Sequence, residues 1–182
     1  MFSLFRRNQP HPTIKRLYGV IVAQARRPAF YTDFGVPDTV EGRFELLLLH
    51  TFLLCHRLKG ESSAAKSASQ ELFDLFLDDM DRTLREMGIG DLSVPKRMKK
   101  IGQAFYGRTA AYDAALENKN GGLAAALARN VLEADVSDPA AARLAAYVQA
   151  AVTRLASISV PVLLSGDAVF PDPAICETPD HV

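Results

Sequence analysis

The residues best suited to chemistry are two histidines and a cysteine in one apolar stretch, His50, Cys55 and His56. Histidines that share a metal on one helix lie four residues apart, but these two lie six apart and face different sides of a helix. Cys55 and His56 are adjacent, and adjacent helical residues do not face each other, so a nucleophile and base pair is not expected. Core or surface histidines explain the pattern better than a metal site.

Three aspartates, Asp78, Asp79 and Asp81, raise the question of a cation site. Calcium loops interleave Asp, Asn and Gly across a turn, and that pattern is missing, so a solvated, salt-bridged helix face is expected. The glycines form no phosphate-binding fingerprint. The second cysteine, Cys176, has no zinc or haem-attachment spacing to Cys55. We therefore expect no enzyme activity, no cofactor, no metal and no small-molecule substrate.

The composition is that of a single globular domain. The chain has 182 residues, 48% of them hydrophobic, and 21 basic residues balance 21 acidic ones. Zero net charge gives no global field that would favour nucleic acid as the main partner. Two cysteines suggest no disulfide framework, so we expect a cytoplasmic location, with peripheral contact at the inner membrane as an option. The longest apolar run, Leu46 to Cys55, has about half of the ~20 residues that a spanning helix needs.

Apolar side chains recur every three or four residues along most of the chain, which predicts an all-α fold. We expect a single-domain bundle of six helices with the second at its centre, because that helix is apolar on most sides. We expect the first helix at residues 13–26 and the second at residues 38–59, with Asp38 as its N-cap. The third ends at Gly88, which has a positive φ, and the fourth is capped by Ser93 and runs past Leu116. The fifth covers residues 123–134, and the last is capped by Asp138 and reaches Ser157.

The organisation around this helical domain is also predicted from composition. Residues 1–12 are expected to form a flexible basic lead, residues 13–158 the helical domain, and residues 159–182 an extended C-terminal tail. Prolines are frequent after Ser159, and a strand-like segment at Val160–Leu164 that packs on the body is one option.

A basic cluster, Lys96-Arg97-Met98-Lys99-Lys100, opens the fourth predicted helix. Cations at a helix N-terminus oppose the helix dipole, so the cluster needs another reason to be there. We expect Asp113, or the acidic face of the third helix, to lie near this cluster or near Arg108. Contact with RNA phosphates is a weaker alternative, and a simple solvated face is the plainest one.

The stretch from Asp81 to Asn130 is distinctive. It contains Gly88-Ile89-Gly90-Asp91, then Phe105-Tyr106-Gly107-Arg108, and then Ala111-Tyr112-Asp113-Ala114-Ala115-Leu116. With the surrounding residues, roughly Tyr18 to Leu132, it resembles the ubiquinol–cytochrome c chaperone family, in what looks like a bacterial version. The resemblance implies a non-catalytic assembly chaperone of the ubiquinol–cytochrome c reductase whose client is nascent or newly inserted cytochrome b.

A chaperone of membrane segments needs a surface for an apolar helix. We expect a groove formed by Leu17, Tyr18, Ile21, the Phe30-Tyr31 loop and part of the second helix, with the alternative that these residues are ordinary core. A second tentative partner surface comprises Lys96, Lys99, Arg108, Tyr112 and Asp113. The basic N-terminus is expected to approach anionic lipid or the ribosome. Two other functions stay open: a membrane- or ribosome-surface adaptor with a different client, and a small helical metal or haem binder.

Overall fold

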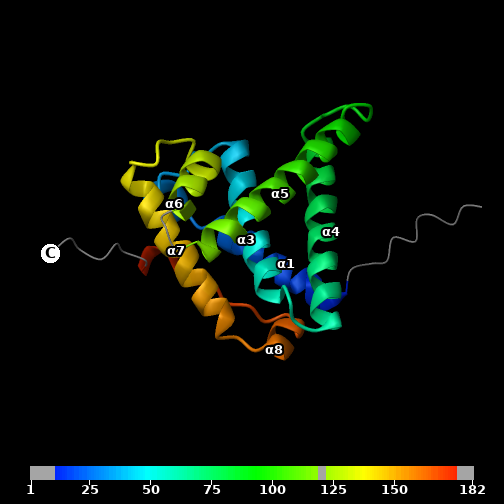
Figure 1. The fold of residues 1–182 in the computed structure, drawn as a ribbon. Coiled ribbons are helices and arrows are strands. Elements are labelled where there is room, and N and C mark those ends of the chain that lie inside the picture. The colour runs from blue at the N-terminus through cyan, green and yellow to red at the C-terminus, as the bar shows by residue number, and fades with distance from the viewer. Residues whose placement is uncertain (1–10, 119–121, 176–182) are drawn as a thin grey trace, which may run out of the picture.

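The computed structural model describes residues 11–118 and 122–175, and these residues form helices, turns and loops without a strand (Figure 1). The predicted all-α fold is therefore confirmed, while most of the basic lead lies outside the described residues. The long helices are α1 (Pro12–Ala25), α3 (Val40–Leu58), α4 (Ser63–Glu86), α5 (Val94–Glu117) and α7 (Pro139–Ala156). Shorter pieces are α2 (Ala29–Thr32), α6 (Gly122–Leu127), a π-helical turn (Ala128–Leu132), α8 (Val160–Leu164) and a 3₁₀ turn (Pro173–Ile175).

Helix α3 lies at the centre of the bundle, as predicted (Figure 1). It packs against α1, α4, α5, α7 and the π-helical turn. Neighbours on so many sides explain why its sequence is apolar nearly all round, and Leu46, Leu49 and Phe52 are completely buried. The charged residues of this helix lie in its first two turns and its last turn, and among them Glu45 is buried.

The start of α3 differs from the prediction, because Thr39 and not Asp38 is the N-cap. The Thr39 hydroxyl accepts a hydrogen bond from the backbone N–H of Gly42 at 3.1 Å, while Asp38 pairs with Arg43. Gly42 is needed here, since a Cβ at this position would lie 2.0 Å from the carbonyl oxygen of Pro37. The preceding loop therefore folds tightly back onto the first turn of the helix.

The connection between α4 and α5 confirms one prediction and corrects another. Gly88 has a φ of +78°, and the N–H of Ile89 donates to the carbonyl of Leu84 at 3.1 Å, so a left-handed glycine ends α4 as expected. Ser93 does occupy the position before α5, but its side chain makes no capping hydrogen bond. Its backbone is already helical, which turns the hydroxyl away from the free N–H groups.

The chain after Ser159 begins with a helix in place of the expected extended segment, while residues 167–172 have no regular secondary structure. Val160–Leu164 forms α8, with Pro161 in its first turn, where proline is tolerated. Beyond it, Ala168 and Phe170 are buried and Asp167 pairs with Arg16 of α1 at 2.7 Å. Leu163, Ala168 and Phe170 of this segment therefore belong to the core, while the predicted tail beyond residue 175 lies outside the described residues.

A buried polar chain ties this last segment to three helices. Gln24 of α1 donates to the Tyr147 hydroxyl at 2.9 Å and to the carbonyl of Pro171 at 2.9 Å. His50 lies 2.8 Å from the same hydroxyl through Nε2 and 2.7 Å from the carbonyl of Leu46 through Nδ1. Since only Nδ1–H can donate to a carbonyl, Nε2 accepts from Tyr147 and the imidazole is neutral. Burial lowers the pKa of His50 to about 4, which agrees with this pattern.

Among the described residues, none of the helices combines the length and apolar character required to span a bilayer.

Candidate functional site

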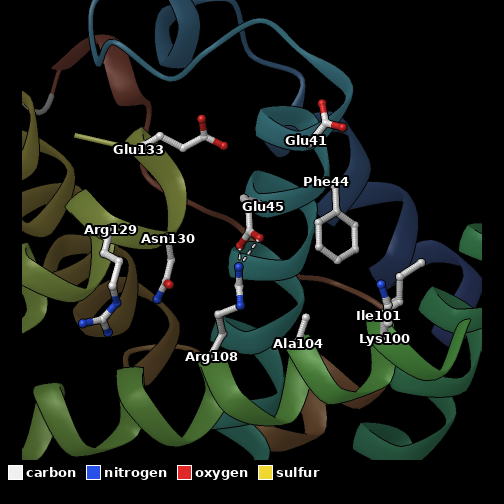
Figure 2. Close-up of a pocket in the computed structure, with 10 residues that line it drawn as sticks. All are labelled: Glu41, Phe44, Glu45, Lys100, Ile101, Ala104, Arg108, Arg129, Asn130 and Glu133. Carbon is white, nitrogen blue, oxygen red and sulfur yellow. Dashed lines mark hydrogen bonds and ion pairs between the residues drawn. The ribbon is translucent and has the colours of Figure 1, made fainter. Parts of the chain in front are cut away.

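A pocket of about 390 Å³ opens where α3, α5 and the π-helical turn meet (Figure 2). Its walls combine both signs of charge with apolar surface. The lining residues are Glu41, Phe44, Glu45, Lys100, Ile101, Ala104, Arg108, Arg129, Asn130 and Glu133. Such a mixture suits a polypeptide segment that carries polar groups beside an apolar face.

The centre of this pocket is an ion pair between Glu45 and Arg108 (Figure 2). Arg108 donates from Nε and Nη2 to the two carboxylate oxygens at 2.8 and 2.7 Å, which is the paired geometry that makes arginine–carboxylate contacts specific. Burial raises the pKa of Glu45, although Arg108 acts in the opposite direction. The ion pair fixes α5 against α3 and orients the arginine across the pocket floor.

Helical spacing brings the pocket residues of α3 and α5 to one face. Lys100, Ala104 and Arg108 follow at steps of four, and Glu41, Phe44 and Glu45 at steps of three and four, so each set forms a stripe along its helix. Because the two helices cross here, the two stripes face each other across the pocket (Figure 2).

The third wall depends on unusual backbone. Ala128–Leu132 forms a π-helical turn, and Glu133 after it has a φ of +52°, a conformation that residues other than glycine rarely adopt. Turns of this kind place one extra residue in a helix and recur at functional sites. Arg129, Asn130 and Glu133 all reach the pocket from this segment. The local departure from regular helix therefore shapes one wall of the pocket.

The tentative partner surface is only partly assembled around this pocket. Arg108 lines it, whereas Tyr112 is completely buried and does not. Desolvation raises the pKa of Tyr112, so its phenol stays protonated. Lys96 and Lys99 are exposed further along α5. Partner binding by these residues stays a prediction.

Asp113 pairs with charges other than the ones expected. Its carboxylate oxygens lie 2.7 Å from His56 Nδ1 and 2.7 Å from Lys59 Nζ, both at the end of α3. Burial acts to raise the pKa of Asp113, but the hydrogen bonds from Lys59 and His56 outweigh it and the pKa is lowered. The expected pairing of Asp113 with Arg108 or the basic cluster is therefore wrong, because α5 presents this residue to the carboxyl end of α3.

The basic cluster forms no ion pair with residues 11–118 or 122–175, and two aspartates of α4 pair with arginines of the same helix. Arg85 lies 2.7 Å from Asp81, and Arg82 pairs with Asp79. The cations that open α5 are exposed on the surface.

In the described part of the chain, most of the residues expected to line an apolar groove belong to the core, which is the alternative given for them. Leu17, Ile21 and Phe30 are completely buried and Tyr18 is 8% exposed, because α3 and α4 cover this side of α1. Tyr31 is half-buried and donates to the carbonyl of Ala25. A second pocket of about 740 Å³ does border Tyr18, between α1 and α4. Its other walls are mostly charged side chains, and the Tyr18 hydroxyl donates to Asp79 at 2.8 Å.

Most of the pocket residues escaped sequence reasoning. Glu41, Phe44 and Glu45 were seen only as parts of a central helix, and Arg129, Asn130 and Glu133 as parts of a regular one. One signal was present: Glu45 stands directly before an apolar run, where an acid is expected to have a buried cationic partner. The identity of that partner, 63 residues away, has no local signature.

The described residues form an all-helical protein with a pocket of mixed charged and apolar character between α3, α5 and the π-helical turn, and they contain no group of three or more His, Cys, Asp or Glu suited to hold a metal. The model of the ubiquinol-cytochrome C chaperone family matches residues 32–170, so the chain belongs to this family. The family consists of assembly chaperones of the ubiquinol–cytochrome c reductase and not of enzymes.

Solved and curated proteins agree with this assignment. A crystal structure of the Cbp3 homolog from Brucella abortus matches with a TM-score of 0.83 and 48% identity, over 90% of this chain and 91% of that one. Ubiquinol-cytochrome-c reductase complex assembly factor 1 of Xenopus laevis is 27% identical over 157 residues, 85% of this chain and 78% of the relative. The Homo sapiens protein is 26% identical over 168 residues, 92% of this chain and 56% of the relative. The chain thus spans about half of the human protein.

Proposed function

We propose that this protein is a non-catalytic chaperone that binds cytochrome b, or a similarly apolar membrane subunit, from the cytoplasmic side during assembly of the ubiquinol–cytochrome c reductase. The family match over residues 32–170 carries this proposal. The family gives the complex that is assembled, and the client within that complex is the step that we add. Cytochrome b is proposed because an apolar subunit gains most from a polypeptide-binding partner before its helices are buried.

We propose the pocket between α3, α5 and the π-helical turn as the client surface. Phe44 and Ile101 offer apolar area at this pocket and are half-buried, so their free faces are available to a partner. Lys100, Arg129 and Glu133 are exposed at its rim. A client segment that places an apolar side chain between α3 and α5 meets charged groups at both ends, which fixes its direction and register.

The rim charges give the sharpest test, because reversing exposed charges is expected to change the stability of the fold little. Lys100 and Arg129 are exposed and make no ion pair with the described part of the chain. In cells that depend on this protein, the double variant Lys100→Glu/Arg129→Glu is expected to recover several-fold less cytochrome b by affinity purification. Assembled reductase, measured by native gel electrophoresis, should fall with it, while the melting temperature of the purified variant stays unchanged.

A matched control is the double variant Lys66→Glu/Arg154→Glu. Both residues are exposed, on α4 and α7, away from the pocket, and the change in net charge is identical. This control is expected to behave like the unchanged protein. Normal recovery of cytochrome b with Lys100→Glu/Arg129→Glu would show that the client binds elsewhere. A third outcome would point to another subunit as the client. In that case deletion of the protein abolishes the reductase, but affinity purification of the unchanged protein recovers no cytochrome b.

A further inference from the structure

The connection between α4 and α5 projects from the body of the protein (Figure 1). We define the hairpin tip as residues 85–100, which comprise the last turn of α4, the connection and the first two turns of α5. Within this tip only Val94 is buried, and Ile89 and Met98 are half-buried. Its remaining side chains are in water, so the tip contributes little to the core and is free to meet a partner.

The tip exposes large apolar side chains at its outermost part. Leu92 is 98% exposed and Met87 is 52% exposed. The two flank a tight turn whose glycines leave room around them, since a Cβ at Gly88 or Gly90 would meet no atom within 4 Å. The surface here is convex, and neither of the two pockets described above is lined by Leu92 or Met87. A convex apolar end cannot enclose a client helix, but its side chains can insert into the interface of a lipid bilayer.

Cations surround this apolar end. Lys96, Arg97, Lys99 and Lys100 are exposed and form no ion pair with residues 11–118 or 122–175. All four lie within the first two turns of α5 and span about 6 Å along the helix axis, at a rise of about 1.5 Å per residue. The N-terminal end of the helix dipole adds to their positive charge. Acids of the tip do not neutralise them, because Asp91 is held by Arg85 at the end of α4 and Glu86 lies near Arg82.

We propose that the hairpin tip docks the protein on an anionic lipid bilayer. Leu92 and Met87 enter the interface, where apolar side chains reach about 5–10 Å into the boundary of headgroups and acyl chains. At that depth, the four cations of α5 stand level with the anionic headgroups. Nucleic acid fits less well, because a charged phosphate backbone offers no apolar surface for an exposed leucine to contact. This proposal does not depend on which client the protein binds.

The test uses the purified full-length protein and lipid vesicles alone, without any client. Co-sedimentation is measured with phosphatidylcholine vesicles and with vesicles that also contain phosphatidylglycerol. The unchanged protein is expected to bind only the anionic vesicles and to be released by salt. Lys96→Glu/Lys99→Glu should weaken binding by about 25-fold or more, at about fivefold for each lysine lost. Leu92→Ser should weaken it by about tenfold or more.

Matched controls are Lys66→Glu/Arg154→Glu for charge and Val136→Ser for an exposed apolar residue, since Val136 is 56% exposed away from the tip. Both should bind like the unchanged protein. The proposal is overturned if the unchanged protein does not bind anionic vesicles, or if the tip variants bind as well as it does. It is also overturned if Arg6→Glu/Arg7→Glu alone removes the binding, which would place the contact at the N-terminus. Lys100 belongs both to the tip and to the pocket rim, so it is left unchanged in this test; Lys96 and Lys99 do not line the client pocket and the vesicles contain no client, so the result does not depend on client binding.

Discussion

Single residues in this protein are decisive where they are buried and polar, or where the backbone is unusual. His50 is completely buried, yet both ring nitrogens have partners, so its neutral form is stabilised without any metal or substrate. Its phenolic partner Tyr147 is shared with Gln24, which joins α1, α3 and α7 through one hydroxyl. A residue that first suggested chemistry is thus explained by the architecture of the core.

His50 should make the protein sensitive to mild acid. Its pKa is about 4 in the folded protein against 6.5 in an unfolded chain, so between these values the unfolded state binds the extra proton. Stability is therefore lost as pH falls through this window, by about 2 kcal/mol between pH 8 and pH 5. The measurement is urea unfolding at several pH values for the unchanged protein and for His50→Gln. The difference between their free energies of unfolding should shrink toward pH 5, and a constant difference would refute the assignment.

Gly88 should be required for its backbone conformation alone. With φ at +78° and no atom within 4 Å of an added Cβ, a substitution meets strain but no clash. Gly88→Val is expected to destabilise the protein by about 1–2 kcal/mol, the cost of a left-handed conformation. Gly90→Val is the control in the same connection, because Gly90 has an ordinary φ and equally open space. Equal melting temperatures for the two variants would contradict this.

At the scale of elements, most helix boundaries follow from the residues near them in sequence. The predicted boundaries are wrong where the local sequence allows two alternatives. Asp38 and Thr39 are both good N-caps in sequence, and the approach of Pro37 to Gly42 selects Thr39. Val160–Leu164 was expected to be extended because prolines follow it, although Pro161 fits a first helical turn. Helix α6 was expected to continue regularly to Ala134, and the π-helical turn that replaces its end has no sequence signature known to us.

The cap of α3 gives a direct test of the corrected boundary. Thr39→Ala removes the acceptor for the Gly42 N–H and should cost about 1 kcal/mol. Asp38→Ala breaks only an exposed pair with Arg43 and should change the stability little. Thermal unfolding of the two variants, measured side by side, decides between them. A larger loss for Asp38→Ala would restore the original assignment of the cap.

Across the whole molecule, long-range pairing is what sequence reasoning could not supply. Periodicity predicted the bundle, its central helix and the end of α4, because each depends on neighbours within a few residues. The pocket depends on Glu45 meeting Arg108, and the burial of Leu17 depends on α3 and α4 covering α1. An apolar face on a helix shows that something covers it, but not whether the cover is the same chain or a client.

The segment after α8 should matter for the stability of the entire bundle. Phe170 is 7% exposed and its ring lies 5.2 Å from the ring of His50, so it closes the core over α3. Phe170→Ala is expected to cost about 3–5 kcal/mol. The neighbouring Val169 is 51% exposed, and Val169→Ala should have little effect. Chemical unfolding of both variants tests this, and similar small losses would mean that residues 165–171 only rest on the surface.

At the π-helical turn Ala128–Leu132, selection for a stable helix and selection for the pocket act in opposite directions. Deleting one of its residues would leave a regular helix with better hydrogen-bond geometry. The same deletion would rotate every side chain before it by about 100° relative to the chain that follows. Asn130 and Arg129 would then leave the pocket. A lineage that kept only the fold would drop the extra residue, so its retention among descendants would record that the pocket is still in use.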